Sequence, residues 1–244
     1  MREVRAFTDQ PLATGTEVSL DESAARHLGT VLRLRAGDPI TLFNGRGGEY
    51  RAELTACSGK RATVQIKEFL DIDRESPLRI HLGLGLSRGD RMDWAIQKAT
   101  EAGVTEITPL FTERTEVKFK GDRGDKKWRR WHQVCISACE QCLRNRLPTV
   151  HQPCGLDEWL AGTDAQQKLV LHHRSENTLH QLRDRRATSA ALLIGPEGGL
   201  TAPEISDAIQ AQFQPLTLGP RVFRTETAPV VAISILQSLW GDFL

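Results

Sequence analysis

The sequence of 244 residues predicts an α/β protein in two parts, a small β-barrel followed by a larger domain with a mostly parallel sheet. Two observations predict this arrangement. Up to about residue 70, short apolar alternations are typical of strands, with a single helical stretch among them. From Leu78 onward, apolar strands alternate with amphipathic helices, which is the pattern of a sheet whose strands are mostly parallel.

The first part is expected to consist of several short strands. Residues 40–43 form an apolar run that leads into the glycine-rich stretch 44–48, a loop of the hairpin type. Residues 49–57 and 61–69 then alternate between apolar and polar side chains, as strands with one buried face do. Several strands and one helix in so short a stretch favour a small β-barrel.

The single helix of this part is expected to begin near Asp21 and Ser23, because their side-chain oxygens can cap a helix start. Its apolar face is predicted to contain Ala24, Leu28, Val31 and Leu32. A polar, charged stretch that ends in proline, residues 71–77, follows the last strand of this part. We place the domain boundary there, which gives a first domain of residues 1–72 and a second of residues 73–244.

Strands and helices alternate regularly in the second domain. A helix is expected from Asp90, as its cap, to Gly103, and a longer one over residues 128–142. Residues 201–204 have the pattern of a capping box with proline near the helix start. Residues 230–240 form a helix that is apolar on most sides and must be buried, in the core or against another subunit. Strands are predicted at residues 80–86, 104–111, 169–171, 190–194 and 216–218.

The charge of the chain is almost balanced, with a formal net charge of +1, so overall electrostatics favour no particular partner. The basic residues are nevertheless concentrated between residues 118 and 146, where the sequence contains nine basic and three acidic residues. We expect residues 118–127 to form a basic loop. Such a patch suits a partner that carries phosphates. A solvated basic loop explains the same charges equally well, so charge alone leaves both interpretations open.

We expect a cytoplasmic protein without a membrane-spanning segment. The first residues are charged, and no apolar run approaches the roughly 20 residues of a spanning helix. The five cysteines are an odd number without a secretory signal, which reduced thiols explain most simply.

The sequence gives little support for a metal site or for a hydrolase with a nucleophilic side chain. His132, Cys135, Cys139 and Cys142 could bind zinc only in pairs, because ten residues of helix extend over about 15 Å, whereas all ligands must lie about 2.3 Å from one ion. We therefore expect no metal and interpret these cysteines as packing residues. Neither a G-x-S-x-G elbow nor a P-loop nor a G-x-G-x-x-G pattern occurs, so a serine hydrolase and a nicotinamide cofactor are poorly supported.

Two loops that contain glycine and proline give the clearest functional signal. Residues 195–199 (Gly-Pro-Glu-Gly-Gly) follow one predicted strand, and residues 219–228 begin with Gly-Pro-Arg after another. Open α/β sheets bind ligands at the carboxyl ends of their strands, and glycine lets backbone groups approach a ligand closely. The pair predicts the two walls of one pocket, which contains charged residues that a simple turn would not need: Arg221, Arg224 and Glu226.

These two loops closely resemble the signature of the bacterial RsmE family. Further matching stretches lie at residues 27–33, 97–104, 112–114 and 138–148, so the resemblance extends over nearly the whole chain. The chain departs from the usual pattern at Ala102 and Phe223, where the family usually shows larger or differently shaped aliphatic residues. Both positions lie among apolar residues, so the departures concern local packing.

Members of this family methylate N3 of a uridine near the 3′ end of 16S ribosomal RNA. The resemblance implies a PUA-like RNA-binding barrel followed by a SPOUT-type α/β domain, whose C-terminal segment is threaded into a trefoil knot. Periodicity alone would not predict a knot, because true knots are nearly absent from proteins. The resemblance also implies a homodimer packed through the knot region, the 16S rRNA of the 30S ribosomal subunit as partner, and S-adenosylmethionine as cofactor.

The resemblance places a bent cofactor against the backbone of the loops after Leu171, Ile194 and Leu218. The expected cofactor-binding residues are Leu171, His172, Ile194, Gly195, Pro196, Glu197, Gly198, Gly199, Leu216, Leu218, Gly219, Arg221, Phe223, Thr225, Thr227 and Ala228.

Uracil N3 becomes a good nucleophile only when it loses its proton, and the negative charge then spreads onto O2 and O4. A permanently charged arginine aimed at these oxygens would stabilise that charge. We therefore predict Arg221 or Arg224 in this role and Glu226 as a base or an orienting group. Alternatively, Glu226 provides favourable charge at the start of the last helix.

The expected RNA contacts are the basic residues Arg5, Arg26, Arg33, Arg114, Lys118, Lys120, Lys126, Lys127, Arg144 and Arg146. Two other functions stay open. One is a non-catalytic RNA-binding protein, and the other is a knotted methyltransferase that acts on another RNA, such as tRNA ribose.

Overall fold

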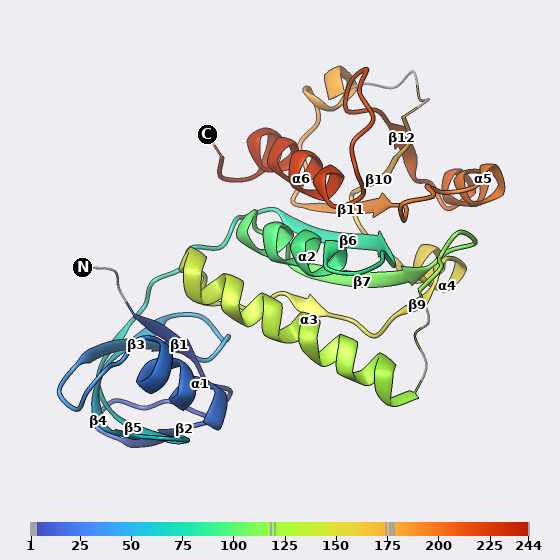
Figure 1. Cartoon of the computed structure of the whole chain (residues 1–244). Coiled ribbons are helices and arrows are strands. Elements are labelled where there is room, and N and C mark those ends of the chain that lie inside the picture. The colour runs from blue at the N-terminus through green and yellow to red at the C-terminus, as the bar shows by residue number, and fades with distance from the viewer. Residues whose placement is uncertain (1–3, 118, 120, 174, 176–178, 244) are drawn as a thin grey trace. The chain divides into compact units, whose positions relative to one another are not determined.

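The computed structural model describes residues 4–117, 119, 121–173, 175 and 179–243 (Figure 1). The chain divides into two compact units. The first consists of Met1–Glu75 with Cys139–Leu147, and the second of Ser76–Ala138 with Pro148–Leu244. The end of helix α3 (Gly121–Cys142) and the residues after it thus belong to the first unit, whereas the sequence pattern places them in the second domain.

The first unit is built on a sheet of five strands in the order β1-β3-β4-β5-β2. Alternate side chains of these strands, among them Leu42, Leu54 and Val64, are completely buried in a common core. The predicted strands and the hairpin between β3 and β4 are therefore confirmed. The strands are β1 (Arg5–Phe7), β2 (Glu17–Leu20), β3 (Pro39–Phe43), β4 (Glu49–Ser58) and β5 (Arg61–Leu70).

Helix α1 (Glu22–Arg26) begins as predicted, because the Asp21 carboxylate accepts the N–H of Ala24 at 2.7 Å. It then continues as a π-helical turn, His27–Val31. Val31 and Leu32 are 64% and 40% exposed, so their prediction as part of the buried face is wrong. The reason is the wider π-helical turn, which rotates the following positions away from the face that an α-helix would present.

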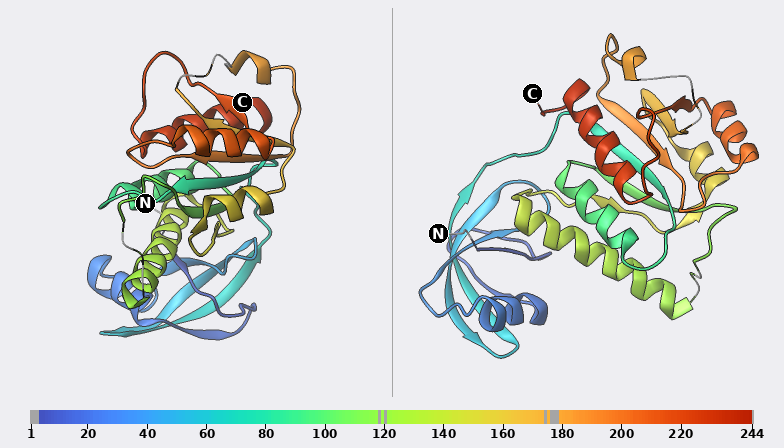
Figure 2. Two further views of the ribbon diagram at one scale, coloured as in Figure 1. Left: turned by 90° about the vertical axis from the view of Figure 1, so that its right-hand side faces the viewer. Right: turned by 45° about the horizontal axis from the view of Figure 1, so that its top comes forward.

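The second unit contains a sheet with the strand order β12-β10-β11-β6-β7-β8, with β9 also paired to β7. Figure 2 shows the ribbon of this unit in two further views. All of these pairs are parallel, so the predicted parallel sheet is confirmed. The strands are β6 (Arg79–Gly85), β7 (Glu106–Phe111), β8 (Thr149–Val150), β9 (Cys154–Gly155), β10 (Gln167–Leu171), β11 (Ser189–Ile194) and β12 (Gln214–Leu216).

Helices pack on both faces of this sheet, because successive side chains of the fully buried strand β11 point into two different cores. Leu192 belongs to the core that contains Ile233 of α6, whereas Leu193 belongs to the core that contains Trp159 of α4. The helices besides α3 are α2 (Arg91–Glu101), α4 (Leu156–Gly162), α5 (Ala202–Gln210), α6 (Thr227–Trp240) and a 3-10 helix, Leu179–Leu182.

Helix α6 is buried through both apolar and polar contacts. Ile233 and Leu236 lie in the core, and Gln237 is completely buried as well. The side chain of Gln237 accepts a hydrogen bond from Ser76 at 2.6 Å and donates one to the carbonyl of Ala102 at 3.0 Å. Neither α6 nor any other helix in the described part of the chain is long and apolar enough to span a membrane.

Two details of the helices differ from the predictions. Asp90 occupies the position before α2 but does not cap it, since its carboxylate instead accepts a hydrogen bond from Arg130 at 3.3 Å. Helix α3 begins at Gly121, so Lys126 and Lys127 lie on a helix and not in the predicted basic loop.

Candidate functional site

Three neighbouring strands of the second unit end at the same edge of the sheet. Strands β12, β10 and β11 are adjacent and parallel, so the loops that follow them emerge side by side. The N–H of His172, after β10, donates to the carbonyl of Leu216, at the end of β12, at 3.0 Å. An edge where several parallel strands end in loops is the usual ligand-binding position in an open α/β sheet.

A cavity of about 870 Å³ lies between these loops. Its volume is that of a site for a small molecule or a cofactor, which is about 300–1,000 Å³. Of the predicted cofactor-binding residues, Gly219 and Thr227 are not part of its lining. The predicted cofactor-binding residues that do line it, together with the predicted catalytic residues Arg224 and Glu226, are Leu171, His172, Ile194, Gly195, Pro196, Glu197, Gly198, Gly199, Leu216, Leu218, Arg221, Phe223, Thr225 and Ala228.

The loop after β11, which we call the first loop (residues 195–201), is a tight turn against the end of β6. The N–H of Gly199 donates to the carbonyl of Pro196 at 2.8 Å, and Gly199 has a φ of +69°, which favours glycine. A Cβ atom at Gly85 would lie 2.4 Å from the nitrogen of Pro196. Only glycine at position 85 therefore lets strand and turn come so close.

Three arginines hold the first loop in place. Arg114 donates from its guanidinium to the carbonyl of Gly198 at 2.6 Å. The backbone N–H of Arg88 and the guanidinium of Arg91 both donate to Glu197 Oε1 at 2.9 Å. Burial alone would raise the pKa of Glu197, but the hydrogen bonds from Arg88 and Arg91 outweigh it and hold that pKa below its ordinary value.

The end of the first loop is fixed by the start of α5, where the predicted capping box is confirmed. The Thr201 hydroxyl accepts the N–H of Glu204 at 3.4 Å, and the Glu204 carboxylate accepts the N–H of Thr201 at 2.8 Å. The other oxygen of Glu204 accepts the N–H of Glu113 at 2.7 Å. The carboxylate thereby ties the segment after β7 to the first loop.

The loop after β12, which we call the second loop (residues 217–226), is held mainly near its end. Thr225 is buried and donates from its hydroxyl to the carbonyl of Gly195 at 2.9 Å, which joins the two loops. Arg221 and Arg224 are exposed, and Val222 is 74% exposed. Both arginines line the cavity, so their guanidinium groups can reach a ligand from the solvent side.

Glu226 is the acidic group at the end of the second loop. Its Oε1 lies 3.9 Å from the Nε of Arg91. Its Oε2 is buried and has no hydrogen-bond partner among the described residues. A buried carboxylate oxygen without a partner costs free energy, so a partner supplied by a ligand is a reasonable expectation.

Sequence reasoning missed Arg91, which contacts Glu197 in the first loop and Glu226 in the second. The signal was present, because Arg91 follows the predicted strand of residues 80–86 and any strand of a parallel sheet can contribute its carboxyl end. What the sequence does not give is the strand order, which places β6 directly beside β11.

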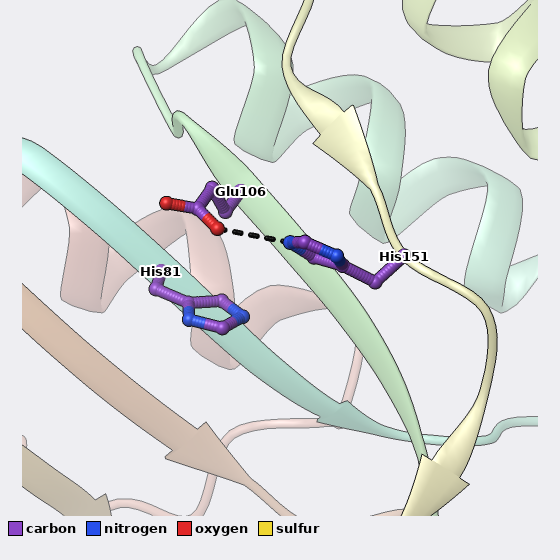
Figure 3. A group of neighbouring side chains, drawn as sticks. All are labelled: His81, Glu106 and His151. Atoms are coloured by element: carbon purple, nitrogen blue, oxygen red, sulfur yellow. Dashed lines mark hydrogen bonds and ion pairs between the residues drawn. The ribbon is translucent and has the colours of Figure 1, made fainter. Parts of the chain in front are cut away.

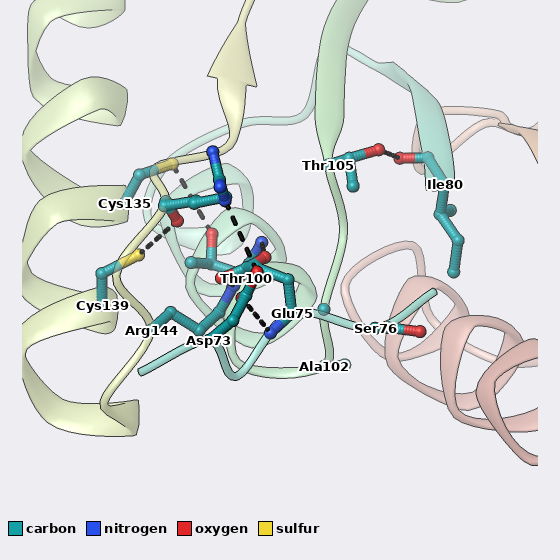
Figure 4. Close-up of polar contacts among 12 residues, drawn as sticks. Asp73, Glu75, Ser76, Ile80, Thr100, Ala102, Thr105, Cys135, Cys139 and Arg144 are labelled. Carbon is teal, nitrogen blue, oxygen red and sulfur yellow. Dashed lines mark hydrogen bonds and ion pairs between the residues drawn. The ribbon is translucent and has the colours of Figure 1, made fainter. Parts of the chain in front are cut away.

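Two of the predicted RNA contacts are internal to the first unit. The Arg5 side chain is completely buried and donates to Glu49 at 2.6 Å and to Asn145 at 2.6 Å. Arg144 is also buried, and its Nε donates to the Glu75 carboxylate at 3.1 Å (Figure 4). Both guanidinium groups serve ion pairs that hold the unit together, which corrects their prediction as RNA contacts.

The other predicted RNA contacts are placed differently. Arg26, Arg33, Arg114, Lys126 and Arg146 are exposed, and Lys127 is half-buried. Lys118 and Lys120 lie outside the described residues. The exposed groups can meet phosphates, and their role as RNA contacts stays a prediction.

A cluster of possible metal ligands occurs on neighbouring strands, formed by His81, Glu106 and His151 (Figure 3). Their ligand atoms lie within 4.8 Å of one another, and Glu106 and His151 share a hydrogen bond of 2.9 Å. The indole N–H of Trp159, however, donates to the Nε2 of His81 at 3.1 Å and occupies its lone pair. Burial also lowers the pKa of His81, as suits a neutral acceptor. We interpret the group as neighbouring polar side chains with separate hydrogen-bond partners, His151 with Glu106 and His81 with Trp159.

Known proteins show the same two-part organisation. Residues 74–237 match the model of an RNA methyltransferase domain, and residues 20–67 match that of an RNA methyltransferase PUA domain. These two matches define an RNA methyltransferase with a PUA domain. The ribosomal RNA small subunit methyltransferase E of Buchnera aphidicola (strain APS) is 33% identical over 98% of this chain and 94% of its own. The chain belongs to this methyltransferase family.

Two solved structures resemble the chain over its full length. A methyltransferase from Legionella pneumophila, in complex with its cofactor SAM, matches with a TM-score of 0.95 at 40% identity, and each chain is covered to 100%. A ribosomal RNA small subunit methyltransferase E from Neisseria gonorrhoeae, bound to S-adenosyl methionine, matches with a TM-score of 0.92 at 40% identity, again with each chain covered to 100%.

Proposed function

We propose that this chain transfers a methyl group from S-adenosylmethionine to N3 of one uridine, uridine 1498, in 16S rRNA of the small ribosomal subunit. The observation that carries the proposal is the cavity between the loops after β10, β11 and β12, because it joins an anchored glycine turn to two exposed arginines. The two solved relatives that hold the same cofactor support the choice of methyl donor.

The residues of the cavity fit this cofactor. Its walls combine apolar side chains, such as Ile194 and Leu218, with the backbone of a glycine-rich turn. Apolar surface suits an adenine ring, and backbone N–H and C=O groups suit its polar edge and the ribose hydroxyls. Open space surrounds Gly199, where a Cβ atom would meet no atom within 4 Å. When bound, the cofactor supplies an activated methyl group on a sulfonium.

Arg221 and Arg224 would stabilise the charge that develops on the uracil. Both line the cavity, and both are exposed before the RNA binds. A uracil that has lost its N3 proton carries negative charge on O2 and O4, and a guanidinium has several donors for two such oxygens. The two arginines would therefore favour the reactive form of the base without taking part in a covalent bond.

Glu226 would orient or deprotonate the base. It lies in the same cavity lining as the two arginines, and Arg91 lies close to one of its carboxylate oxygens. The second oxygen has no hydrogen-bond partner among the described residues, which leaves it able to accept one from a bound group. The N3–H of uracil is a donor of the required kind.

We further propose that RNA binding uses both units. Arg26, Arg33 and Arg146 are exposed in the first unit, and Arg114 and Lys126 in the second. Each phosphate that they neutralise releases bound counterions, so the affinity for a 16S rRNA fragment should fall steeply as salt rises. An affinity that stays constant between low and moderate salt would contradict this part of the proposal.

The path of the chain after β12 supports a trefoil knot. Strand β12 lies at one edge of the sheet, whereas α6 packs against α2, which follows β6. The second loop must therefore cross past the first loop, and the hydrogen bond from Thr225 to Gly195 lies on that crossing. We propose that the crossing is a threading, that a homodimer packs through this region, and that the enzyme works in the cytoplasm, where ribosomes are assembled.

Mapping the methylated nucleotide tests the proposal directly. RNA from a strain that lacks the gene, with and without complementation, would be digested and compared by mass spectrometry. We expect one methyl group on N3 of the target uridine, present only after complementation. A methyl group on tRNA ribose instead would identify a different RNA substrate, and no methyl group together with no S-adenosylmethionine binding by calorimetry would identify a non-catalytic RNA-binding protein.

A further inference from the structure

Another cavity, of about 500 Å³, lies in the second unit beside the segment that joins β6 to α2. We call residues 87–93, which comprise the connection after β6 and the first residues of α2, the β6–α2 segment. It forms one side of the cavity, and the first half of α3 forms the other. None of the roles proposed so far for the cavity between the loops uses this space.

The floor of this cavity is apolar and its rim is basic. Met92 and Trp131 lie beneath the cavity but are only 1% and 4% exposed, so its open apolar surface comes mainly from the half-buried Val117 and from the methylene groups of the basic side chains. Among the described residues, Arg88, Arg123, Lys127 and Arg130 belong to the lining together with two acidic residues, Asp90 and Asp93, which gives these residues a net charge of +2. A cavity with some apolar surface and cations around it is complementary to a nucleotide, whose base is apolar on its faces and whose phosphate is an anion.

The acidic groups of the lining occupy only part of the basic rim. Asp90 and Asp93 both pair with Arg130. Arg88 pairs with Glu116, which lies outside the cavity lining. Arg123 is exposed on the first turn of α3 and has no ion pair with any described residue. Its guanidinium is therefore available to a phosphate.

The β6–α2 segment separates this cavity from the one between the loops. Ser87 lines the smaller cavity, and its hydroxyl lies 3.4 Å from the hydroxyl of Thr225 in the larger one. Arg88 lines the smaller cavity, while its backbone N–H donates to Glu197 in the larger one. The two cavities thus share one wall that is a single stretch of chain thick.

We propose that the smaller cavity binds an RNA nucleotide next to the target uridine, with its base against Val117 and the planar or aliphatic parts of the basic side chains and its phosphate at Arg123 and Lys127. The inference rests on the proposed function. A base can reach the larger cavity only if it leaves its stack, and this leaves the neighbouring nucleotide without one partner. If the smaller cavity binds the neighbouring nucleotide, its contacts compensate for the lost stacking. They also favour the one uridine whose neighbour fits this cavity.

The test is a cycle that combines protein and RNA changes. Arg123→Glu with Lys127→Glu is compared with Arg129→Glu, an exposed residue of the same helix outside the cavity lining. The substrate is a 16S rRNA fragment that contains the target uridine, or a reconstituted 30S subunit if only that is methylated. Each RNA is made intact and with an abasic residue on the 5′ or the 3′ side of the target, and KM and kcat for methylation are measured.

With wild-type enzyme, we expect one of the two abasic substitutions to raise KM about tenfold or more, since contacts to one base contribute on the order of 1–3 kcal/mol. The double variant should bind intact RNA more weakly and should lose most of this difference between intact and abasic RNA. Arg129→Glu should weaken binding by its charge alone and keep the difference.

Each other outcome overturns a specific statement. If the double variant and Arg129→Glu respond alike to the abasic residue, the smaller cavity is no nucleotide site, although the methyltransferase function stands. If wild-type enzyme methylates neither substrate, the proposed function itself fails, and this inference fails with it. Unchanged binding of S-adenosylmethionine in calorimetry shows that both variants are folded, because none of the substituted residues lines the larger cavity.

Discussion

The two loops that enclose the larger cavity are built in opposite ways. The first loop is held by hydrogen bonds from Arg88, Arg91 and Arg114 and by the close approach of Gly85. The second loop is joined to the first through Thr225, while Arg221, Val222 and Arg224 are exposed. The difference suits two tasks. A fixed wall preorganises the cofactor site, and an open wall leaves charged groups accessible to RNA.

This contrast also separates the expected effects of mutation. Changes in the first loop should act on cofactor affinity, because its groups form the backbone wall. Changes in the exposed part of the second loop should act on the rate of methyl transfer, because its guanidinium groups face developing charge. Separate measurements of cofactor affinity and of the methylation rate can therefore test whether the two loops have different roles.

The largest effect is expected for Arg224→Ala. The backbone carbonyl of Arg224 accepts the N–H groups of Thr227 and Ala228 at the start of α6, and truncation of the side chain leaves these bonds in place. Loss of one group that stabilises developing negative charge typically lowers a rate about 10²–10³-fold. We expect that loss in single-turnover methylation at saturating cofactor, with less than about a threefold change in cofactor affinity.

Arg221→Ala is the comparison variant, because Arg221 lines the same cavity on the same loop. If Arg224→Ala kept the wild-type single-turnover rate while Arg221→Ala lost it, the role would move to Arg221. If both kept it, the assignment of charge stabilisation to the second loop would be wrong.

The next effect is expected for Gly85→Ala in the wall behind the first loop. The added Cβ would lie 2.4 Å from the nitrogen of Pro196, so strand or turn must shift. Overpacking of this kind costs about 1–3 kcal/mol, which corresponds to roughly a fivefold to 150-fold loss of cofactor affinity if the turn yields. Calorimetry measures the affinity. Gly162→Ala is the control, because a Cβ there meets no atom within 4 Å, and unchanged binding in Gly85→Ala would show that the close contact is not needed.

The sequence predicts some features of the two loops and not others. Their position after strands and their glycines are visible in the chain, since both depend on local patterns. The partners of the first loop are not visible, because Arg91 and Arg114 come from segments that only the strand order brings to β11. The same reason explains why Arg5 was wrongly predicted as an RNA contact. Its charge is visible in the sequence, but its partners Glu49 and Asn145 lie far from it along the chain.

A smaller effect is expected for Arg91→Ala. The Arg91 side chain is 44% exposed and the Glu197 side chain is 33% exposed, so water screens their ion pair. Such pairs contribute about 0.2–1 kcal/mol, and we expect at most about a fivefold loss of cofactor affinity. Lys98→Ala is the control on the same helix, because its ammonium pairs with Glu101.

A double-mutant cycle sharpens this prediction. If Arg91 acts through Glu197, then Arg91→Ala combined with Glu197→Gln should cost less cofactor affinity than the sum of the two single changes. Additive losses would show that Arg91 acts on the cavity by another route, for which its approach to Glu226 at 3.9 Å is the first candidate.

The smallest effect is expected for the charge of Glu197 alone. Its pKa is held below the ordinary 4.5, so the folded state favours the ionised carboxylate. Such a group stabilises the fold at pH values above its ordinary pKa, and this stabilisation disappears as the pH falls through the pKa of the folded state. Glu197→Gln keeps an oxygen that can accept from Arg88 and removes only the charge. The difference in free energy of unfolding between wild type and Glu197→Gln, measured by urea titration, should be below about 1 kcal/mol at neutral pH and vanish in acid. A difference that persisted in acid would mean that the shape of the first loop, and not the Glu197 charge, holds it against α2.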